Sequence, residues 1–102
     1  MTFILCYITN SNEQEALKII RHLTEKRIVA CGNAFPVKSA YWWKGKIDNT
    51  DEWVAIVKTK EKNWKRVKEE VKKIHSYEIP CIIKIKVEAN EDYEKWLNNE
   101  VK

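Results

Sequence analysis

The spacing of hydrophobic residues divides the chain into predicted strands and helices. Continuous apolar runs and apolar–polar alternation are typical of strands, whereas apolar residues three and four positions apart mark one face of a helix. The helices are predicted at 13–26, 61–75 and 91–100, and the strands at 3–9, at 28–35 with a continuation over 37–43, at 52–59 and at 81–87.

Local signals refine these elements. The run FILCYIT at 3–9 is apolar almost throughout, which indicates a strand buried on both faces. Ser11 followed three residues later by Gln14 matches a capping box and predicts the start of the first helix. Pro36 interrupts the second strand and indicates a bulge or an edge position, because proline cannot donate a ladder hydrogen bond. Gly45 falls in a turn, so the flanking strands predict a long hairpin.

The order strand, helix, strand, strand, helix, strand predicts an α+β, ferredoxin-like βαββαβ fold. This fold has an antiparallel four-stranded sheet with two helices on one face, and here an additional C-terminal helix follows. With 102 residues, the chain is expected to form one domain, 1–102.

The densest stretch of the chain is AYWWKGK, with three consecutive aromatic residues. Neighbouring side chains of a strand point to opposite faces, so Tyr41 and Trp43 share one face and Trp42 takes the other. Helices cover only one face, so a single chain cannot bury all three rings. Each ring buries on the order of 200 Å², and leaving one exposed forfeits several kcal/mol. Another protein chain, a nucleic acid or a small ligand is therefore expected to cover them.

Self-association is the favoured explanation. A long hairpin arm that is apolar on both faces suits pairing with neighbouring chains in a closed assembly. A nucleic-acid partner is disfavoured, because the net charge is only +4 and basic and acidic residues are mixed. The third strand also lacks the glycine of RNA-recognition domains and begins with acidic residues. Frequent Lys and Glu are compatible with a thermophilic source and a thermostable protein.

Cysteine usage and the N-terminus bear on location. Cys6, Cys31 and Cys81 are widely spaced and form no C-x-x-C pair, which favours small buried hydrophobic residues in a reducing compartment. The N-terminus has no basic leader, and its apolar run has only strand length, so neither a signal peptide nor a membrane span is predicted. The protein is expected in the cytoplasm, without a membrane partner.

The sequence contains none of the common catalytic or phosphate-binding motifs, so an enzyme is not expected. One segment, HSYEIPC at 75–81, does contain side chains that can bind a metal. His75, Glu78 and Cys81 together suit a soft or borderline metal such as copper or zinc. Their spacing matches no standard motif, and a capping histidine, a surface glutamate and a buried cysteine remain the alternative.

Two other sets of polar residues allow more than one interpretation. Lys58 and Thr59 end the third strand, where the lysine could bind an anion, pair with Glu52 or simply be solvated. His22 lies among charged residues of the first helix, which favours a surface position.

Several segments together resemble the divalent-cation tolerance proteins, the CutA family. These segments are RIVACGN (27–33), SAYWWKGKI (39–47), Glu52, KT (58–59), HSYEIP (75–80) and YEKWL (93–97), in the order and spacing of that family. The resemblance implies a ferredoxin-like fold assembled as a homotrimer, in which each hairpin arm extends the sheet of the adjacent subunit. It also implies a link to tolerance of copper and other divalent metals. The fold and trimer are similar to those of nitrogen-regulatory signalling proteins, which sense small molecules in inter-subunit clefts.

The resemblance also indicates site residues. Ser76 and Cys81 stand where the family usually has proline and glutamate, so Cys81 either makes a softer metal site or removes a ligand. The family's patterned positions correspond to Cys31, Asn33, Ser39, Tyr41, Trp43, Gly45, Lys46, Glu52, Lys58, Thr59, His75, Tyr77 and Pro80. From these, the expected ligand-binding residues are Ser39, Tyr41, Trp43, Glu52, Lys58, Thr59 and Tyr77.

Two functions follow. The first is a cytoplasmic homotrimer that binds divalent metal, with copper favoured, through His75 together with Glu78 or Cys81. The alternative is a small-molecule sensor that uses the cleft around Tyr41, Lys58 and Tyr77.

Overall fold

The computed structural model describes residues 2–102, and Met1 of the predicted domain lies outside them. Its elements follow the predicted order, with three helices, four strands and one short 3-10 turn. They are β1 Phe3–Asn10, α1 Glu13–Glu25, β2 Cys31–Trp43, β3 Lys46–Thr59, the 3-10 turn Glu61–Asn63, α2 Trp64–Ile74, β4 Ile82–Val87 and α3 Glu91–Glu100.

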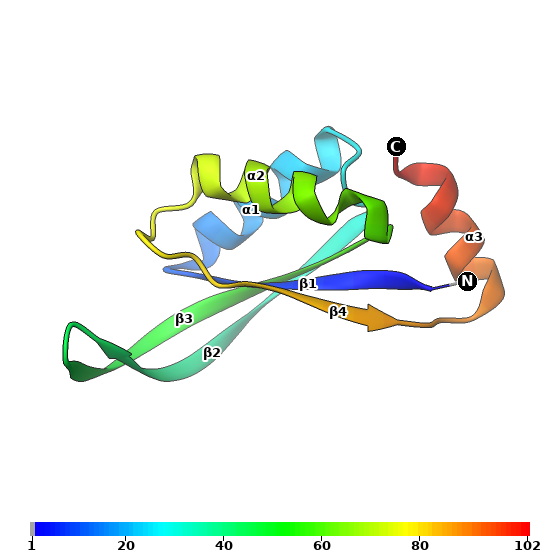
Figure 1. Ribbon diagram of the computed structural model, residues 1–102. Helices are drawn as coiled ribbons and strands as arrows, with labels where there is room; N and C mark the ends of the chain where they lie inside the picture. Colours follow the sequence, from blue (N-terminus) through cyan, green and yellow to red (C-terminus); the bar gives the residue numbers. More distant parts are fainter. Residues whose placement is uncertain (1) are drawn as a thin grey trace.

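The four strands form one antiparallel sheet in the order β2-β3-β1-β4. Helices α1 and α2 lie side by side over one face of this sheet, and the opposite face carries no helix (Figure 1). Helix α3 packs at the end of the sheet where both termini lie (Figure 1). The predicted α+β, ferredoxin-like arrangement with an additional C-terminal helix is therefore confirmed.

The main hydrophobic core lies between the sheet and α1 and α2. Alternate residues of β1 point into it, and Ile4, Cys6 and Ile8 are fully buried. Ile19 and Leu23 of α1 meet them from the helix layer. This arrangement follows from the period of two along a strand and the spacing of three and four along a helix.

The other face of β1 is only half covered, so the prediction of a strand buried on both faces was wrong for the single chain. Leu5 and Tyr7 point to the open face and are partly exposed. Their partners on β4, Ile85 and Ile83, are 43% and 47% exposed. The continuous apolar run reflects a second apolar surface that the chain's own helices do not reach.

Strands β2 and β3 continue past the end of β1 and form an arm, defined here as residues 37–52 (Figure 1). A two-residue turn closes it, with positive φ at Lys44 (51°) and Gly45 (80°). Positive φ at both positions is the geometry of turns that match the twist of a hairpin. Pro36 lies on β2, the edge strand, which confirms its predicted edge position.

Several element boundaries differ from the predictions. The cap of α1 is Asn12, whose Oδ1 accepts from Glu15 N at 2.8 Å, while Glu15 Oε1 accepts from Ser11 N at 2.9 Å. The capping pair therefore lies one residue later than the predicted Ser11 and Gln14. The segment predicted as strand from residue 28 begins pairing at Cys31, because Ile28 and Val29 turn into the core after the helix.

Helices α1 and α2 are joined through the carboxylate of Glu70. It lies 2.8 Å from Lys26 Nζ, 2.7 Å from Lys73 Nζ and 3.0 Å from His22 Nε2. Hydrogen bonds from Lys26, then Lys73 and His22, lower the pKa of Glu70 to about 2. His22, expected at the surface, is therefore partly covered by this contact.

Replacing Glu70 with glutamine is expected to lower the thermal midpoint by a few degrees near neutral pH. A carboxylate whose folded pKa lies below its unfolded value of about 4.3 stabilises the fold above that value. This contribution is lost as the pH falls through the folded pKa of about 2. Circular dichroism melts between about pH 2 and pH 7 measure the difference.

Glu69→Gln is the matched control, because Glu69 forms an exposed pair with Lys65 at 4.0 Å and has no hydrogen bond from its side chain among residues 2–102. An effect of Glu70→Gln that is equal at both ends of the pH range would contradict the assignment.

Candidate functional site

A pocket of about 780 Å³ lies where the arm, the end of β1 and the segment between α2 and β4 meet. This segment, residues 75–81, is called the 75–81 loop below. A pocket of this volume is in the range that takes a small organic ligand. The lining residues are Thr9, Ser39, Ala40, Tyr41, Trp42, Trp43, Asp48, Glu52, Ser76, Tyr77, Glu78, Ile79 and Cys81.

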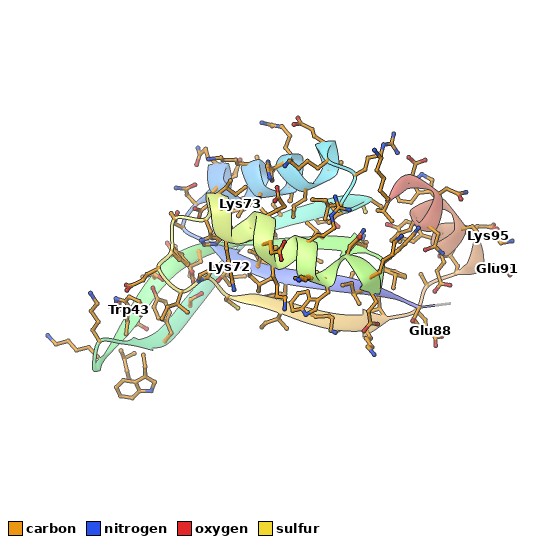
Figure 2. The ribbon with its side chains drawn as sticks, turned by 45° about the horizontal axis from the view of Figure 1, so that its top comes forward. Trp43, Lys72, Lys73, Glu88, Glu91 and Lys95 are labelled. Atoms are coloured by element: carbon orange, nitrogen blue, oxygen red, sulfur yellow. The ribbon has the colours of Figure 1, made fainter. Side chains whose placement is uncertain are left out.

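The register of the arm decides which side chains lie on its two faces. Tyr41 pairs with Asp48 and shares a face with Trp43, while Trp42 pairs with Ile47 on the other face. The predicted separation of the two tryptophans is confirmed, and Trp42 is 72% exposed. Figure 2 shows Trp43 on the arm, at the far end of the molecule from α3.

Three hydrogen bonds hold the start of the 75–81 loop against the body of the protein. His75 Nε2 lies 2.7 Å from the carbonyl oxygen of Thr9, and Ser76 N donates to Glu15 Oε2 at 2.9 Å. Tyr77 OH donates to Glu52 Oε2 at 2.6 Å. Burial would raise the pKa of Glu15, but the bonds from Ser76 and Ser11 outweigh it and lower the pKa.

The Tyr77–Glu52 hydrogen bond joins the loop to the arm. Glu52 is only 5% exposed, and burial together with this carboxylate raises the pKa of Tyr77 well above its ordinary value. The phenol therefore stays protonated and donates. No described residue donates to the second oxygen of Glu52, Oε1, and no described cation lies in salt-bridge range of this carboxylate.

Of the predicted metal ligands, two line this pocket and one holds the loop. Glu78 and Cys81 belong to the lining. Both ring nitrogens of His75 have partners, since Nδ1 accepts from Tyr77 N at 3.0 Å and Nε2 faces Thr9 O. Within residues 2–102, no three or more His, Cys, Asp or Glu side chains gather closely enough to hold a metal ion. A single chain thus presents donors of suitable chemistry without assembling them.

Five of the predicted ligand-binding residues, Ser39, Tyr41, Trp43, Glu52 and Tyr77, lie together in this pocket, but Lys58 and Thr59 do not line it. Thr59 is buried and donates to Ile28 O. Lys58 Nζ reaches Asn33 Oδ1 at 3.4 Å and lies over the Tyr93 ring. Lys58 does not form the ion pair with Glu52 that the sequence allowed. The two residues lie six positions apart on the same extended strand, which separates them by about 20 Å.

The pocket also includes residues that the sequence did not indicate as ligand-binding or metal-binding. Asp48, Ser76 and Ile79 line it, and Glu15 anchors its loop. Asp48 was missed because the third strand was predicted to begin at Glu52, although Asp48 and Glu52 lie on the same face at an even spacing. Contacts of the loop with Thr9 and Glu15 link distant parts of the chain and leave no local signal.

Comparison with known proteins identifies the class of this chain, the divalent ion tolerance proteins. The family described as CutA1 divalent ion tolerance protein matches residues 4–100. A divalent-cation tolerance protein CutA from Thermotoga maritima is 50% identical over 99 residues, covering 96% of this chain and 98% of the relative. The CutA protein of Pyrococcus horikoshii is 42% identical over 100 residues, covering 97% and 98%. This chain therefore belongs to the CutA1 divalent ion tolerance family.

Solved structures agree with this assignment. The structure described as the periplasmic divalent cation tolerance protein CutA from Archaeoglobus fulgidus superposes with a TM-score of 0.93 at 40% identity, covering 100% of both chains. CutA1 from Oryza sativa superposes with a TM-score of 0.95 at 30% identity, covering 100% of this chain and 95% of the other. Within residues 2–102, no helix is long and apolar enough to cross a membrane.

Tyr77→Phe is expected to lower the free energy of unfolding by about 1–3 kcal/mol, because it removes a hydrogen bond to a charged acceptor. Urea unfolding followed by circular dichroism measures the change. Tyr7→Phe is the control, since no described residue bonds to the Tyr7 hydroxyl. Equal effects of the two substitutions would mean that the Tyr77–Glu52 bond adds nothing to stability.

Proposed function

We propose that this protein is a homotrimer that binds divalent metal ions, copper among them, and that it acts by binding rather than by catalysis. The family is named for divalent ion tolerance. The observation that supports a binding role is that Glu78 and Cys81 line one pocket with no hydrogen-bond partner among the described residues. A carboxylate and a thiol beside an imidazole suit copper or zinc.

In this proposal the 75–81 loop supplies His75, Glu78 and Cys81, and a second subunit completes the coordination. His75 takes part by exchanging its bond from Tyr77 N for the metal, because Nδ1 already offers its lone pair as an acceptor. A contribution from the second subunit would complete the donor group that residues 2–102 of the single chain do not assemble.

Titration of copper(II) into the protein, followed by calorimetry, tests the metal site. His75→Ala and Cys81→Ser are each expected to weaken binding about tenfold or more, a loss seen even for groups that only orient a ligand. His22→Ala is the control, because His22 contacts Glu70 on the helix layer. Unchanged affinity in both loop variants would remove the 75–81 loop as the metal site.

The trimer is supported by two apolar surfaces that the single chain leaves uncovered. Trp42 and Ile47 on one face of the arm are 72% and 56% exposed, and Phe35, Ile83 and Ile85 are exposed on the open face of the sheet. Surfaces of this kind on an otherwise polar chain are typical of protein interfaces. An arm that pairs with the next subunit would cover both in a closed ring.

Light scattering after gel filtration is expected to give about three times 12.2 kDa. Trp42→Glu should dissociate the assembly, because it places a charge in an apolar contact. Leu17→Glu is the control, since Leu17 is 42% exposed on α1, away from the arm. A wild-type monomer at micromolar concentration would contradict the trimer.

A small-molecule sensor is the second candidate. It is favoured by the volume of the pocket, about 780 Å³, and by the aromatic side chains of Tyr41, Trp43 and Tyr77 in its lining. A lone metal ion needs neither feature.

We also place the protein in the cytoplasm and expect it to be thermostable, with no nucleic-acid partner. Three free cysteines support a reducing compartment. The Archaeoglobus relative, by contrast, is described as periplasmic. The network of Lys26, Lys73 and His22 around Glu70 supports thermostability, because networks of ion pairs contribute more at high temperature.

A further inference from the structure

The charged side chains that line the pocket are all acidic. Asp48, Glu52 and Glu78 line it, and no lysine, arginine or histidine of residues 2–102 does. The chain as a whole carries a net charge of +4, so this negative pocket contrasts with the rest of the surface. Neither Asp48 nor Glu78 has an ion-pair or hydrogen-bond partner among the described residues.

Glu52 is the most informative of the three carboxylates. It is 95% buried, since only 5% of its surface is exposed, and its Oε1 lacks a donor in the part of the chain that is described. The hydrogen bond to Oε2 comes from a neutral phenol, so no described group supplies a positive charge beside this carboxylate. A donor that carries positive charge would complement it, and the side chain already lines the pocket.

The aromatic side chains of the pocket suit the same kind of ligand. Tyr41 and Trp43 lie on the face of the arm that also carries Glu52, and Tyr77 stands opposite on the loop. Aromatic faces attract cations and also pack against methylene groups. The combination of carboxylates and aromatic faces distinguishes an organic cation from a bare metal ion, which has no apolar surface to bury.

The second hollow of the surface lacks these properties. It has a volume of about 390 Å³ and is lined by Glu88, Ala89, Glu91, Glu94 and Lys95, with no aromatic residue. It also carries its own counter-charge, because Lys95 Nζ lies 3.0 Å from Glu91 Oε1. Figure 2 shows Glu88, Glu91 and Lys95 at the end of the molecule opposite to Trp43. The pocket between the arm and the 75–81 loop, called the arm pocket below, therefore differs from the second hollow in more than its acidic side chains. It also has aromatic side chains and, among residues 2–102, lacks a basic residue in its lining.

We propose that the pocket between the arm and the 75–81 loop binds a small organic cation with primary amine groups, such as a protonated diamine. One ammonium group donates to Glu52 Oε1, to which no described residue donates, and the methylene chain lies against Tyr41 and Trp43. The second ammonium group is held at the mouth of the pocket by Asp48. No covalent step is involved.

This inference shares the pocket with the proposed metal site but uses different residues. The diamine depends on Glu52, Asp48 and the aromatic side chains, whereas the metal depends on His75 and Cys81 with Glu78. The two proposals can therefore fail separately. Copper binding without diamine binding overturns only the present inference, and diamine binding without copper binding overturns only the metal site.

Calorimetric titration of the assembled protein with 1,4-diaminobutane at low ionic strength tests the inference. We expect saturable binding that weakens as salt is added, because screening reduces the attraction between charges. 1,4-Butanediol has the same length without charge and is expected not to bind. If butanediol binds as tightly as the diamine, or if neither binds at millimolar concentration, the inference is overturned.

Variants assign the binding to this pocket. Glu52→Gln is expected to weaken the diamine about tenfold or more, because a hydrogen bond between two charged groups is lost. Asp51→Asn is the matched control, since Asp51 is the neighbouring residue and its exposed carboxylate pairs with Lys38 at 2.9 Å. Its affinity is expected to stay within about twofold of wild type.

Two further variants keep the test decisive even if Glu52→Gln does not fold. Asp48→Asn lies on the exposed arm and Trp43→Leu removes one aromatic face, and each is expected to weaken the diamine several-fold. Wild-type diamine affinity in Asp48→Asn and Trp43→Leu would place the ligand elsewhere and contradict the proposal.

Discussion

The hydrogen bond from Tyr77 to Glu52 is the contact on which the pocket depends. Strands β2 and β3 run past the end of β1, so the arm by itself is a two-stranded ribbon in solvent. The 75–81 loop crosses to it and is fixed by a 2.6 Å bond between phenol and carboxylate. Together with the His75 and Ser76 contacts at the base of the loop, this bond turns an extended arm into one wall of a pocket.

The same bond has an electrostatic consequence. It holds the Glu52 carboxylate in a position where only 5% of the residue is exposed, yet it satisfies only one of the two oxygens. A neutral phenol cannot balance the charge, so the site is complementary to a cation. A divalent metal ion and an organic diamine are both positively charged, which is why the two proposals concern the same pocket.

Much of the fold could be predicted because its signals are local. The alternation that separates Tyr41 and Trp43 from Trp42 is a property of any strand, and the turn at Lys44 and Gly45 follows from a hairpin with a glycine between its strands. The exposed apolar face could also be foreseen, since two helices cover only one side of a sheet.

The site could be predicted only in part, because its key contacts join distant residues. Tyr77 and Glu52 are 25 residues apart, and His75 meets Thr9 across 66 residues. No spacing rule predicts that His75 uses both ring nitrogens to hold a loop, or that Glu52 pairs with a phenol and not with Lys58. The cap at Asn12 shows the limit for local signals too, because the capping pair lies one residue later than the predicted Ser11 and Gln14.

The claim that the arm pocket is the cation site is tested most directly by nuclear magnetic resonance. Spectra with labelled glutamate side chains and tryptophan indoles would be followed as copper(II), an equivalent diamagnetic divalent ion, or 1,4-diaminobutane is added. The account predicts that the Glu52 carboxyl and the Trp43 indole shift with the diamine, while Glu88 and Glu91 at the opposite end stay unchanged. Shifts confined to Glu88 and Glu91, or no shift at Glu52, would contradict it.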